Sequence, residues 1–458
     1  MKTIRPHRKL EIEFGNEEII TPSGLSLVGA VLSKSNFVRT MDSLSVSDKR
    51  SKPYIKSSDC CKAYIGMLCQ GKTQFEDVRE LLEDPDYFKF VLGIDTLIPS
   101  PETLRQRMDS IGCKYRSSIL KSNADMLTKC VEPTALSNGY IPLNIDVSPF
   151  DNSKSNKEKV SHTYKNFMGY APIFAYLGAE GYLANAQLRP GSQHCQNGTC
   201  EFLKETLNLS HKVTDSPLLV RMDSGNDASA NFGILIEDGS YFIVKHKRTN
   251  NETKEGWLSF VQSVCKNVTT PRDGKTVYIG STWKPVEYVD SKGGHQTINM
   301  RMVYEVIERT VDKRGQYLLP ADIEVNLWWV NVGLSDEEVI ELYHQHGEME
   351  QFHSEIKSDM DVERLPSGKF DTNELVLELT ILAYNILRII GQSSLKGPHA
   401  VRRRHEVKRL RLKTVIKNLI LIAGHVVKHA RKVFLRLGRS NIWRFVFKDL
   451  YTRFAVAV

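Results

Sequence analysis

The segment YHQHGEMEQFHSEIK, which runs from Tyr343 to Lys357, places polar side chains at helical spacing. Five of them stand at offsets of three, four, three and four residues: Tyr343, His346, Glu350, His353 and Lys357. At about 100° per residue these five side chains share one stripe of a helix. The stripe calls for an explanation, because Tyr and two His are unusual on a solvated surface.

An apolar face borders this polar stripe. Leu342, Met349, Phe352 and Ile356 cluster beside it and suit packing against a core. A plain solvated face normally lies opposite the apolar one and carries many Lys and Glu pairs. The arrangement favours a functional surface, with the plain solvated face as the alternative.

Two aspartates stand at the ends of predicted strands. YIPLNIDV reaches Asp146 and PLLVRMDSGND reaches Asp223, with further strands and one helix predicted between them. Together with Glu350, these carboxylates would offer the hard oxygen ligands that Mg²⁺ prefers. Two such ions activate the attacking oxygen and stabilise the leaving oxygen in a phosphoryl displacement. A single Asp is more often a turn or cap residue, but three acids at these positions favour a metal site.

The spacing around Glu350 resembles a known signature. Tyr343, two residues, His346, three residues, Glu350, six residues and Lys357 resemble the Y-(2)-R-(3)-E-(6)-K pattern of DDE transposases from bacterial insertion sequences. IDVSPF and VRMDSGND resemble the two Asp blocks of the same enzymes. LRPGSQH and NLWWVNVGLSDEEVIELYHQHGEMEQ are similar in particular to the insertion-sequence 1380 family, which shares the signature with the insertion-sequence 4 group. ELLEDPDYFKFVLG and PSPETLRQRM resemble the N-terminal region of that family, so the likeness runs from about residue 20 to 435.

The resemblance implies an α/β fold. We expect an RNase H-like (retroviral-integrase-like) catalytic core, interrupted by a β-rich insertion and flanked by helical N- and C-terminal regions. The expected boundaries are 1–135 for a helical DNA-binding region, 136–249 for the first part of the core, 250–322 for the insertion, 323–395 for the second part of the core and 396–458 for a basic helical region.

The resemblance also implies an activity. Such enzymes cleave DNA at the ends of an insertion sequence and transfer the cut strands to target DNA, using two Mg²⁺ or Mn²⁺ ions. Asp146, Asp223 and Glu350 would be the catalytic metal ligands. The implied partners are double-stranded DNA, as terminal inverted repeats and as target, and a second copy of the chain in a dimeric DNA complex. The alternatives are a non-catalytic DNA-binding protein derived from a transposase, and an RNase H-like nuclease without strand transfer.

The signature residues around Glu350 would contact DNA. Tyr343, His346 and Lys357 are expected at the phosphate backbone. His346 stands where the family has Arg, and His carries a full charge only below a pKa near 6.5. Either phosphates raise its protonated fraction, or the interaction has weakened and Arg221 or a residue of the C-terminal region replaces it; a role as metal ligand is a third reading.

Aromatic residues of the predicted insertion are candidates for a further contact. In related enzymes an aromatic side chain stabilises a base flipped out of a DNA hairpin. Trp257 and Trp283 are the candidates here, with a plain core position as the alternative for each.

Positive charge is concentrated in residues 396–458. They hold seventeen Lys or Arg and two acidic residues, hence +15, which leaves about −7 for the rest of a chain of net charge +8. VRRRHEVKRLRLKTVIKNLILIAGHVVKHARKVFLRLG interleaves basic and apolar residues and predicts an amphipathic helix ended by Gly438. We favour nucleic acid over a membrane surface as its partner, with packing on a negative neighbouring domain as the alternative. The residues expected to contact DNA are Arg402, Arg403, Arg404, Lys408 and Arg409.

The N-terminal region contains two further motifs. PSPETLRQRM predicts a helix capped by Ser100, from which Arg105 and Arg107 could read DNA as part of a helix-turn-helix; two Arg on a helix are equally compatible with no such role. GMLCQGKT satisfies the phosphate-loop pattern, but no apolar strand precedes it, so Gly71 is interpreted as a helix end.

The eight cysteines predict the compartment. They include no C-x-x-C pair and are interpreted as reduced, mostly structural thiols. No long apolar run or lipidation signal is found, so we expect a bacterial cytoplasmic protein, associated with the nucleoid when bound to DNA and not with a membrane.

Overall fold

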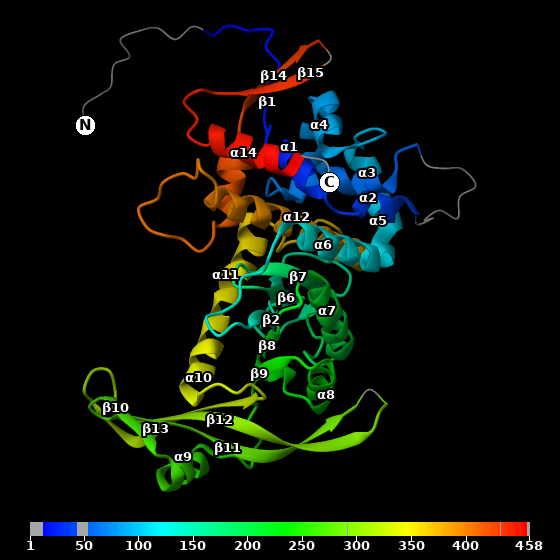
Figure 1. Ribbon diagram of the computed structural model, residues 1–458. Helices are drawn as coiled ribbons and strands as arrows, with labels where there is room; N and C mark the ends of the chain where they lie inside the picture. The colour runs from blue at the N-terminus through cyan, green and yellow to red at the C-terminus, as the bar shows by residue number, and fades with distance from the viewer. Residues whose placement is uncertain (1–11, 44–53, 291, 431, 456–458) are drawn as a thin grey trace.

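Helices fill the first part of the chain. The computed structural model describes residues 12–43, 54–290, 292–430 and 432–455 (Figure 1). The helices before the sheet are α1 (Leu25–Leu32), α2 (Phe37–Ser43), α3 (Ser57–Leu68), η1 (Phe75–Leu82), α4 (Pro85–Leu92), α5 (Pro101–Ile111), η2 (Gly112–Tyr115) and α6 (Arg116–Cys130). The Ser100 side chain caps α5 by accepting a hydrogen bond from the backbone N–H of Thr103, as predicted. Among the described residues, no helix is long and apolar enough to cross a membrane.

The phosphate-loop pattern lies on a helix and its end. Gly66 is inside α3, and Gly71 follows the helix with φ of +74°, a left-handed conformation that favours glycine. Lys72 pairs with Glu80 instead of facing an open loop. The interpretation of this motif as a helix end is therefore confirmed.

One mixed sheet organises the middle of the chain, so the fold is α/β. Its core strands are β2 (Ile141–Val147), β6 (Ile173–Leu177), β7 (Tyr182–Gln187), β8 (Leu218–Met222) and β9 (Tyr241–Lys245). They lie in the order β7-β6-β2-β8-β9. Strands β2, β8 and β9 are mutually parallel, β6 is antiparallel to β2, and β7 is antiparallel to β6. Parallel neighbours bring their carboxyl ends to one edge, where Asp146 and Asp223 stand.

The predicted insertion continues this sheet. Its strands are β10 (Asn267–Arg272), β11 (Lys275–Val289), β12 (His295–Val311) and β13 (Tyr317–Val330), and β13 pairs with β9 through Trp329 and Val244. Figure 1 shows β11 and β12 as long curved ribbons below the core. The sequence predicted only strands here, whereas α9 (Lys254–Val264) precedes them, capped by the Thr253 side chain.

Helices cover both faces of the sheet. On one face α7 (Thr199–Val213), α8 (Ser229–Asp238) and α9 bury Phe202, Phe232 and Trp257 against it. On the other face α10 (Asp336–Gln345) packs against Trp328, while α11 (Met349–Ser354) and the long α12 (Phe370–Leu395) pack against β6 and β7. Asp146 and Asp223 therefore lie at the edge of a three-layer structure.

The helix predicted for the signature segment is not uniform. It begins with a capping box in which Ser335 and Glu338 bond reciprocally, as expected from its sequence. It then tightens into a 3₁₀ turn, η4 (His346–Glu348), continues as α11 and widens into a π-helix, η5 (Glu355–Asp359). These changes of pitch rotate the side chains away from the ideal stripe, and π-helical turns are frequent at functional sites.

The predicted amphipathic C-terminal helix is wrong over most of its length. Among the described residues of 401–438, only α13 (Leu412–Val415) and the π-turn η6 (Ile416–Ile420) are helical. A hairpin of β14 (Gly424–His429) and β15 (Lys432–Leu437) follows, and the helix α14 (Arg444–Ala455) comes after it. Gly438 consequently ends a strand region, not a helix. Val426 and Val427 lie in the hairpin, and β-branched residues fit a pleated surface better than a helix.

The two ends of the described chain are joined. β1 (Ile19–Ile20) pairs with β14, with Ile20 opposite Gly424. One core contains Val28 of α1 together with Leu412 of α13 and Phe447 of α14. The C-terminal segment is thus an integral part of the helical region.

A small second sheet lies beside the carboxyl end of β2. It consists of β3 (Phe150–Asp151), β4 (Ser161–His162) and β5 (Met168–Tyr170), in the order β3-β5-β4. The backbone N–H of Ser148 donates to the carbonyl of Pro172, which closes the base of this excursion between β2 and β6.

Candidate active site

Asp146 and Asp223 come from adjacent parallel strands. Ile145 of β2 is paired with Met222 of β8, so the next residue of each strand lies at the same sheet edge. Asp146 accepts a hydrogen bond from the backbone N–H of Val147 at 2.7 Å, and its side chain is 23% exposed. Register and strand ends thus bring the two predicted carboxylates together.

Glu350 joins them from α11. Its side chain is exposed, and no hydrogen bond to its carboxylate is found within the described part of the chain. The pKa of Asp223 is raised above its usual value, mainly because the surrounding protein removes water from its carboxylate. The negative charge of Asp146 adds to this rise, and that of Glu350 adds a smaller effect. Asp146 and Glu350 therefore both act on Asp223, and a cation would relieve this repulsion.

The donor set is of the chemical kind that hard divalent cations prefer. All the groups are carboxylates on strand ends and a helix, and Mg²⁺ prefers oxygen ligands. Their donor atoms do not all lie within 4.8 Å of one another in the described structure. The three carboxylates are therefore of the right chemical kind for Mg²⁺, but they do not form one compact cluster.

Tyr343 of α10 is hydrogen-bonded to Asp223. Its hydroxyl donates a hydrogen bond to Asp223 Oδ1 at 2.6 Å, and its side chain is buried against Trp328 with ring centroids 5.5 Å apart. This hydrogen bond favours the charged form of Asp223 and opposes the rise of its pKa. Tyr343 was expected at a DNA phosphate, whereas the structure shows it as a support for the carboxylate.

His346 is buried, which corrects the prediction that it contacts DNA. Its side chain is 6% exposed, its ring stacks on Tyr343, and Nδ1 lies 3.3 Å from Asn144 Oδ1. Burial and then the positive charge of Arg221 lower the pKa of His346 to about 3, so it is neutral at physiological pH. Arg221 donates to the same Asn144 oxygen at 2.7 Å and carries the positive charge of this buried region.

His353 is a member of the site that the sequence interpretation left without a role. Its Nε2 lies 3.3 Å from Asp146 Oδ2, and its Nδ1 lies 3.2 Å from the Tyr176 hydroxyl. The ring is 3% exposed and packs against Phe174. The spacing of Glu350 and His353, three residues apart on one helix face, was the available signal.

Lys357 faces the end of β2. Its ammonium group donates to the carbonyl of Pro149 at 2.8 Å and lies 5.7 Å from the centre of the Phe150 ring. Burial lowers the pKa of Lys357, and the charge of Glu363, followed by those of Glu350 and Asp146, opposes that shift. Lys357 is therefore a half-buried cation beside the acids.

The predicted DNA-reading arginines of α5 are engaged within the protein. Arg105 pairs with Glu102 on the helix surface at 2.6 Å. Arg107 lies close enough to the buried Cys60 for its charge to oppose the rise that burial causes in the pKa of that thiol. Neither interaction needs DNA, and the helix-turn-helix interpretation of this region stays a prediction.

The basic residues before α13 differ in exposure. Arg402, Arg403, Arg404 and Lys408 are exposed. Arg409 is largely covered, with its guanidinium 4.5 Å above the Phe352 ring and 3.5 Å from Glu348. The first four are therefore available to a phosphate backbone, whereas Arg409 holds α11.

The two tryptophans of the insertion also differ. Trp257 is 6% exposed and belongs to the core, in agreement with the plain alternative. Trp283 is 65% exposed on β11 and stays a candidate for contact with a base.

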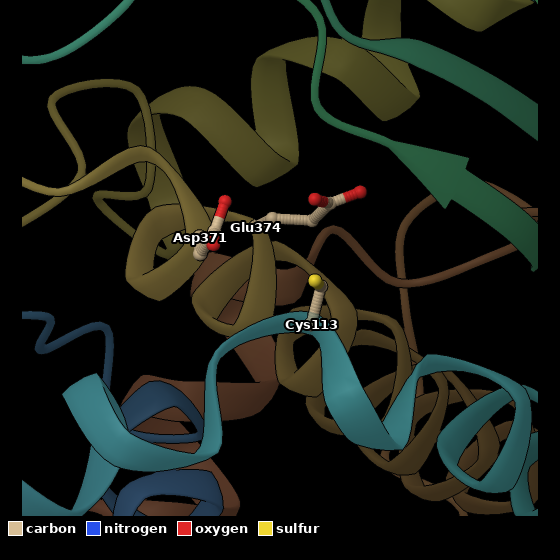
Figure 2. Close-up of side chains that lie close together, drawn as sticks. All are labelled: Cys113, Asp371 and Glu374. Carbon is tan, nitrogen blue, oxygen red and sulfur yellow. The ribbon is translucent and has the colours of Figure 1, made fainter.

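A second group of possible metal ligands lies elsewhere. Cys113 of η2 and Asp371 and Glu374 of α12 have donor atoms within 4.8 Å of one another, and Figure 2 shows the thiol directed toward the two acids. The charges of Arg116 and Lys159 act on Glu374 and partly balance it. The group lies on η2 and α12, not on the strands that carry Asp146 and Asp223.

The chain matches a known protein family over almost its whole length. A family model described as "Transposase DDE domain group 1" matches residues 2–457. No curated protein matches this chain. Among solved structures, the chain is similar to the cryo-EM structure of a piggyBac transposase synaptic complex with hairpin DNA, at 13% identity and a TM-score of 0.38, covering 87% of this chain and 78% of that one.

Proposed function

Because this chain belongs to the transposase DDE domain group 1 family, we propose that it cleaves DNA at the ends of an insertion sequence and joins them to target DNA. Membership of the insertion-sequence 1380 family is part of the proposal and rests on LRPGSQH and the segment around Glu350. The catalytic assignment is supported by the adjacent strand ends that carry Asp146 and Asp223 and by the charge of Glu350 acting on Asp223.

The core is proposed to be RNase H-like. Its support is the strand order β7-β6-β2-β8-β9, in which an antiparallel β2-β6-β7 unit is extended by two parallel strands. The α/β character and the large mixed sheet agree with this proposal. The insertion between β9 and α10 lengthens the same sheet without interrupting the core strands.

The protein's own groups have separable roles in the proposed reaction. Asp146, Asp223 and Glu350 would hold two Mg²⁺ or Mn²⁺ ions, which when bound activate the attacking oxygen and stabilise the leaving one. Tyr343 orients Asp223 and favours its charged form, and His353 orients Asp146 through its Nε2. Lys357 supplies a fixed positive charge beside the site.

The proposed partners are double-stranded DNA and a second copy of the chain. Arg402, Arg403, Arg404 and Lys408 are exposed and would bind phosphates of the inverted repeats or the target. A dimer in the DNA complex is proposed from the resemblance to insertion-sequence transposases. The intact set of three acids argues against a DNA-binding protein without catalysis.

The decisive experiment compares Glu350→Gln with Glu348→Gln. Glu348 is exposed two residues earlier and lies 3.5 Å from Arg409, so its variant controls for a changed charge on the same helix. Incubated with Mg²⁺ and duplexes that carry the inverted repeats flanking the coding region, E350Q should bind DNA and fail to cut it, while E348Q cuts.

Two outcomes separate the alternatives. Near-normal cutting by E350Q would overturn the catalytic assignment. Supplying precut ends and a target plasmid distinguishes a transposase from a nuclease, because a nuclease gives no joined product.

A further inference from the structure

Tyr164 stands at the tip of a tight hairpin. Between β4 and β5, the N–H of Thr163 donates to the carbonyl of Phe167 at 2.8 Å, and the N–H of Asn166 donates to Thr163 at 3.0 Å. Asn166 has φ of 61°, a conformation that Asn tolerates better than most residues. Tyr164 and Lys165 therefore occupy the two central turn positions.

The base of this hairpin is fixed to the segment before α12. The Tyr170 hydroxyl donates to the carbonyl of Glu158 at 2.8 Å, and the Glu158 N–H donates to Gly368 at 2.9 Å. Lys157 donates to the carbonyl of Leu365 at 2.6 Å. A turn held in this way presents its tip in a defined position, as a substrate-contacting group requires.

The Tyr164 hydroxyl lies at the carboxyl end of β2, next to Asp146. It donates to the carbonyl of Val147 at 3.1 Å, and Val147 is the residue whose N–H binds Asp146. Removal of water, followed by the charges of Asp146, Asp223 and Glu350, raises the pKa of Tyr164, so the hydroxyl keeps its proton at neutral pH. The side chain as a whole is 64% exposed, which leaves room for a ligand beside it.

We propose that the Tyr164 hydroxyl donates a hydrogen bond to an anionic oxygen of the DNA phosphate bound at Asp146 and Glu350. This inference rests on the proposed function. In the free protein the donor is used on the neutral carbonyl of Val147, and a charged phosphate oxygen is the stronger acceptor. Rotation about the Cζ–Oη bond redirects the donor while the fixed hairpin keeps the ring in place. Tyr164 thus adds a catalytic residue outside the signature segment.

The test uses Tyr164→Phe, with Tyr317→Phe as its matched control. Both variants lose one hydroxyl from an exposed ring, since Tyr317 on β13 is 81% exposed. On a duplex carrying the flanking inverted repeat, the single-turnover cleavage rate of the saturated Y164F complex with Mg²⁺ should fall about 10- to 100-fold, with little change in DNA affinity. Y317F should cut like the unaltered protein.

Each result has one meaning. A Y164F rate equal to that of Y317F overturns the inference, and so does a loss of affinity with an unchanged rate in the saturated complex. Glu350→Gln is measured alongside: if it cuts normally, the proposed function fails, whereas an inactive E350Q with a fully active Y164F refutes the role of Tyr164 alone.

Discussion

The hydroxyl of Tyr343 lies 2.6 Å from Asp223, 120 residues earlier in the chain, and ties α10 to the end of β8. The tyrosine of the signature is therefore a structural partner of a carboxylate in this protein. His346 and His353 on the following turns likewise face Asn144 and Asp146. The stripe points inward at the carboxyl end of the sheet, and Glu350 is its exposed member.

Tyr343→Phe should weaken metal binding more than it weakens folding. Without the hydroxyl, Asp223 loses a donor that favours its charged form, a contribution of about 1.5–3 kcal/mol for a hydrogen bond to a charged group. The Mg²⁺ concentration for half-maximal DNA cleavage should rise about tenfold or more. Tyr241→Phe, in β9, is the control, and an unchanged Mg²⁺ requirement in Y343F would contradict the role given to this hydrogen bond.

His346 should make the protein less stable in acid. Its folded pKa of about 3 lies below the unfolded value near 6.5, so the unfolded chain binds more protons between these values. Stability from this group is complete above pH 6.5 and falls as the pH drops toward 3, by about 2 kcal/mol at pH 5. Urea unfolding at pH 7 and pH 5 measures the difference.

His346→Gln provides the comparison for this acid dependence. The amide cannot take a proton, so the variant should lose less stability than the unaltered protein between pH 7 and 5. Equal losses in the two proteins would show that His346 is not the group responsible. His246 has its pKa raised by Asp227 and Glu252, and its contribution has the opposite sign.

Arg388→Met should destabilise the helix that carries Glu350. Arg388 and Glu355 form a buried ion pair between α12 and η5, and Arg388 also donates to the carbonyl of Leu410 at 3.0 Å. Removing one partner leaves a buried charge, which costs about 3–5 kcal/mol. Urea midpoints should drop strongly for R388M and recover in part when Glu355→Gln is added. Arg105→Ala, at an exposed pair, should leave the urea midpoint nearly unchanged, and an equally small change for R388M would refute the prediction.

The exposed arginines before α13 should set the salt dependence of DNA binding. Replacing Arg402, Arg403 and Arg404 with Ala should reduce the slope of log affinity against log salt by about 0.9 for each DNA phosphate that the variant no longer neutralises. Binding titrations across salt concentrations measure the slope. Lys212→Ala, at an exposed position of α7, is the control, and an unchanged slope in the triple variant would exclude this segment from the interface. Deleting all of 396–458 is unsuitable, because Leu412 and Phe447 are core residues.

The starts of helices and the ends of strands could be predicted from the sequence, because they depend on residues that are close together in the chain. Ser100 and Ser335 each start a helix because a side-chain oxygen binds an N–H three residues later. Asp146 and Asp223 were placed at strand ends because runs of apolar residues stop there. Each of these predictions depends only on residues a few positions away, so the information for it is present in a single sequence.

Contacts between residues that are far apart in the sequence could not be predicted in this way. Tyr164 and His353 join the site only because the chain returns to β2 at those points. The burial of His346 depends on Asn144 and Arg221, which its own helix does not reveal. The C-terminal hairpin was mistaken for a helix because the alternating pattern of β14 is short and its partner β1 lies near the opposite end of the sequence.

The pairing of β1 with β14 has a consequence for synthesis on the ribosome. The core around Val28 includes Phe447, so the first helices cannot be completely covered until nearly the whole chain has been made. At about 5–20 residues per second, that interval lasts tens of seconds. During it, apolar side chains of α1 and α3 are exposed to chaperones and to other nascent chains. A shortened translation product would consequently lack a closed N-terminal region, so truncated copies should be removed by proteolysis and should not persist as competing DNA binders.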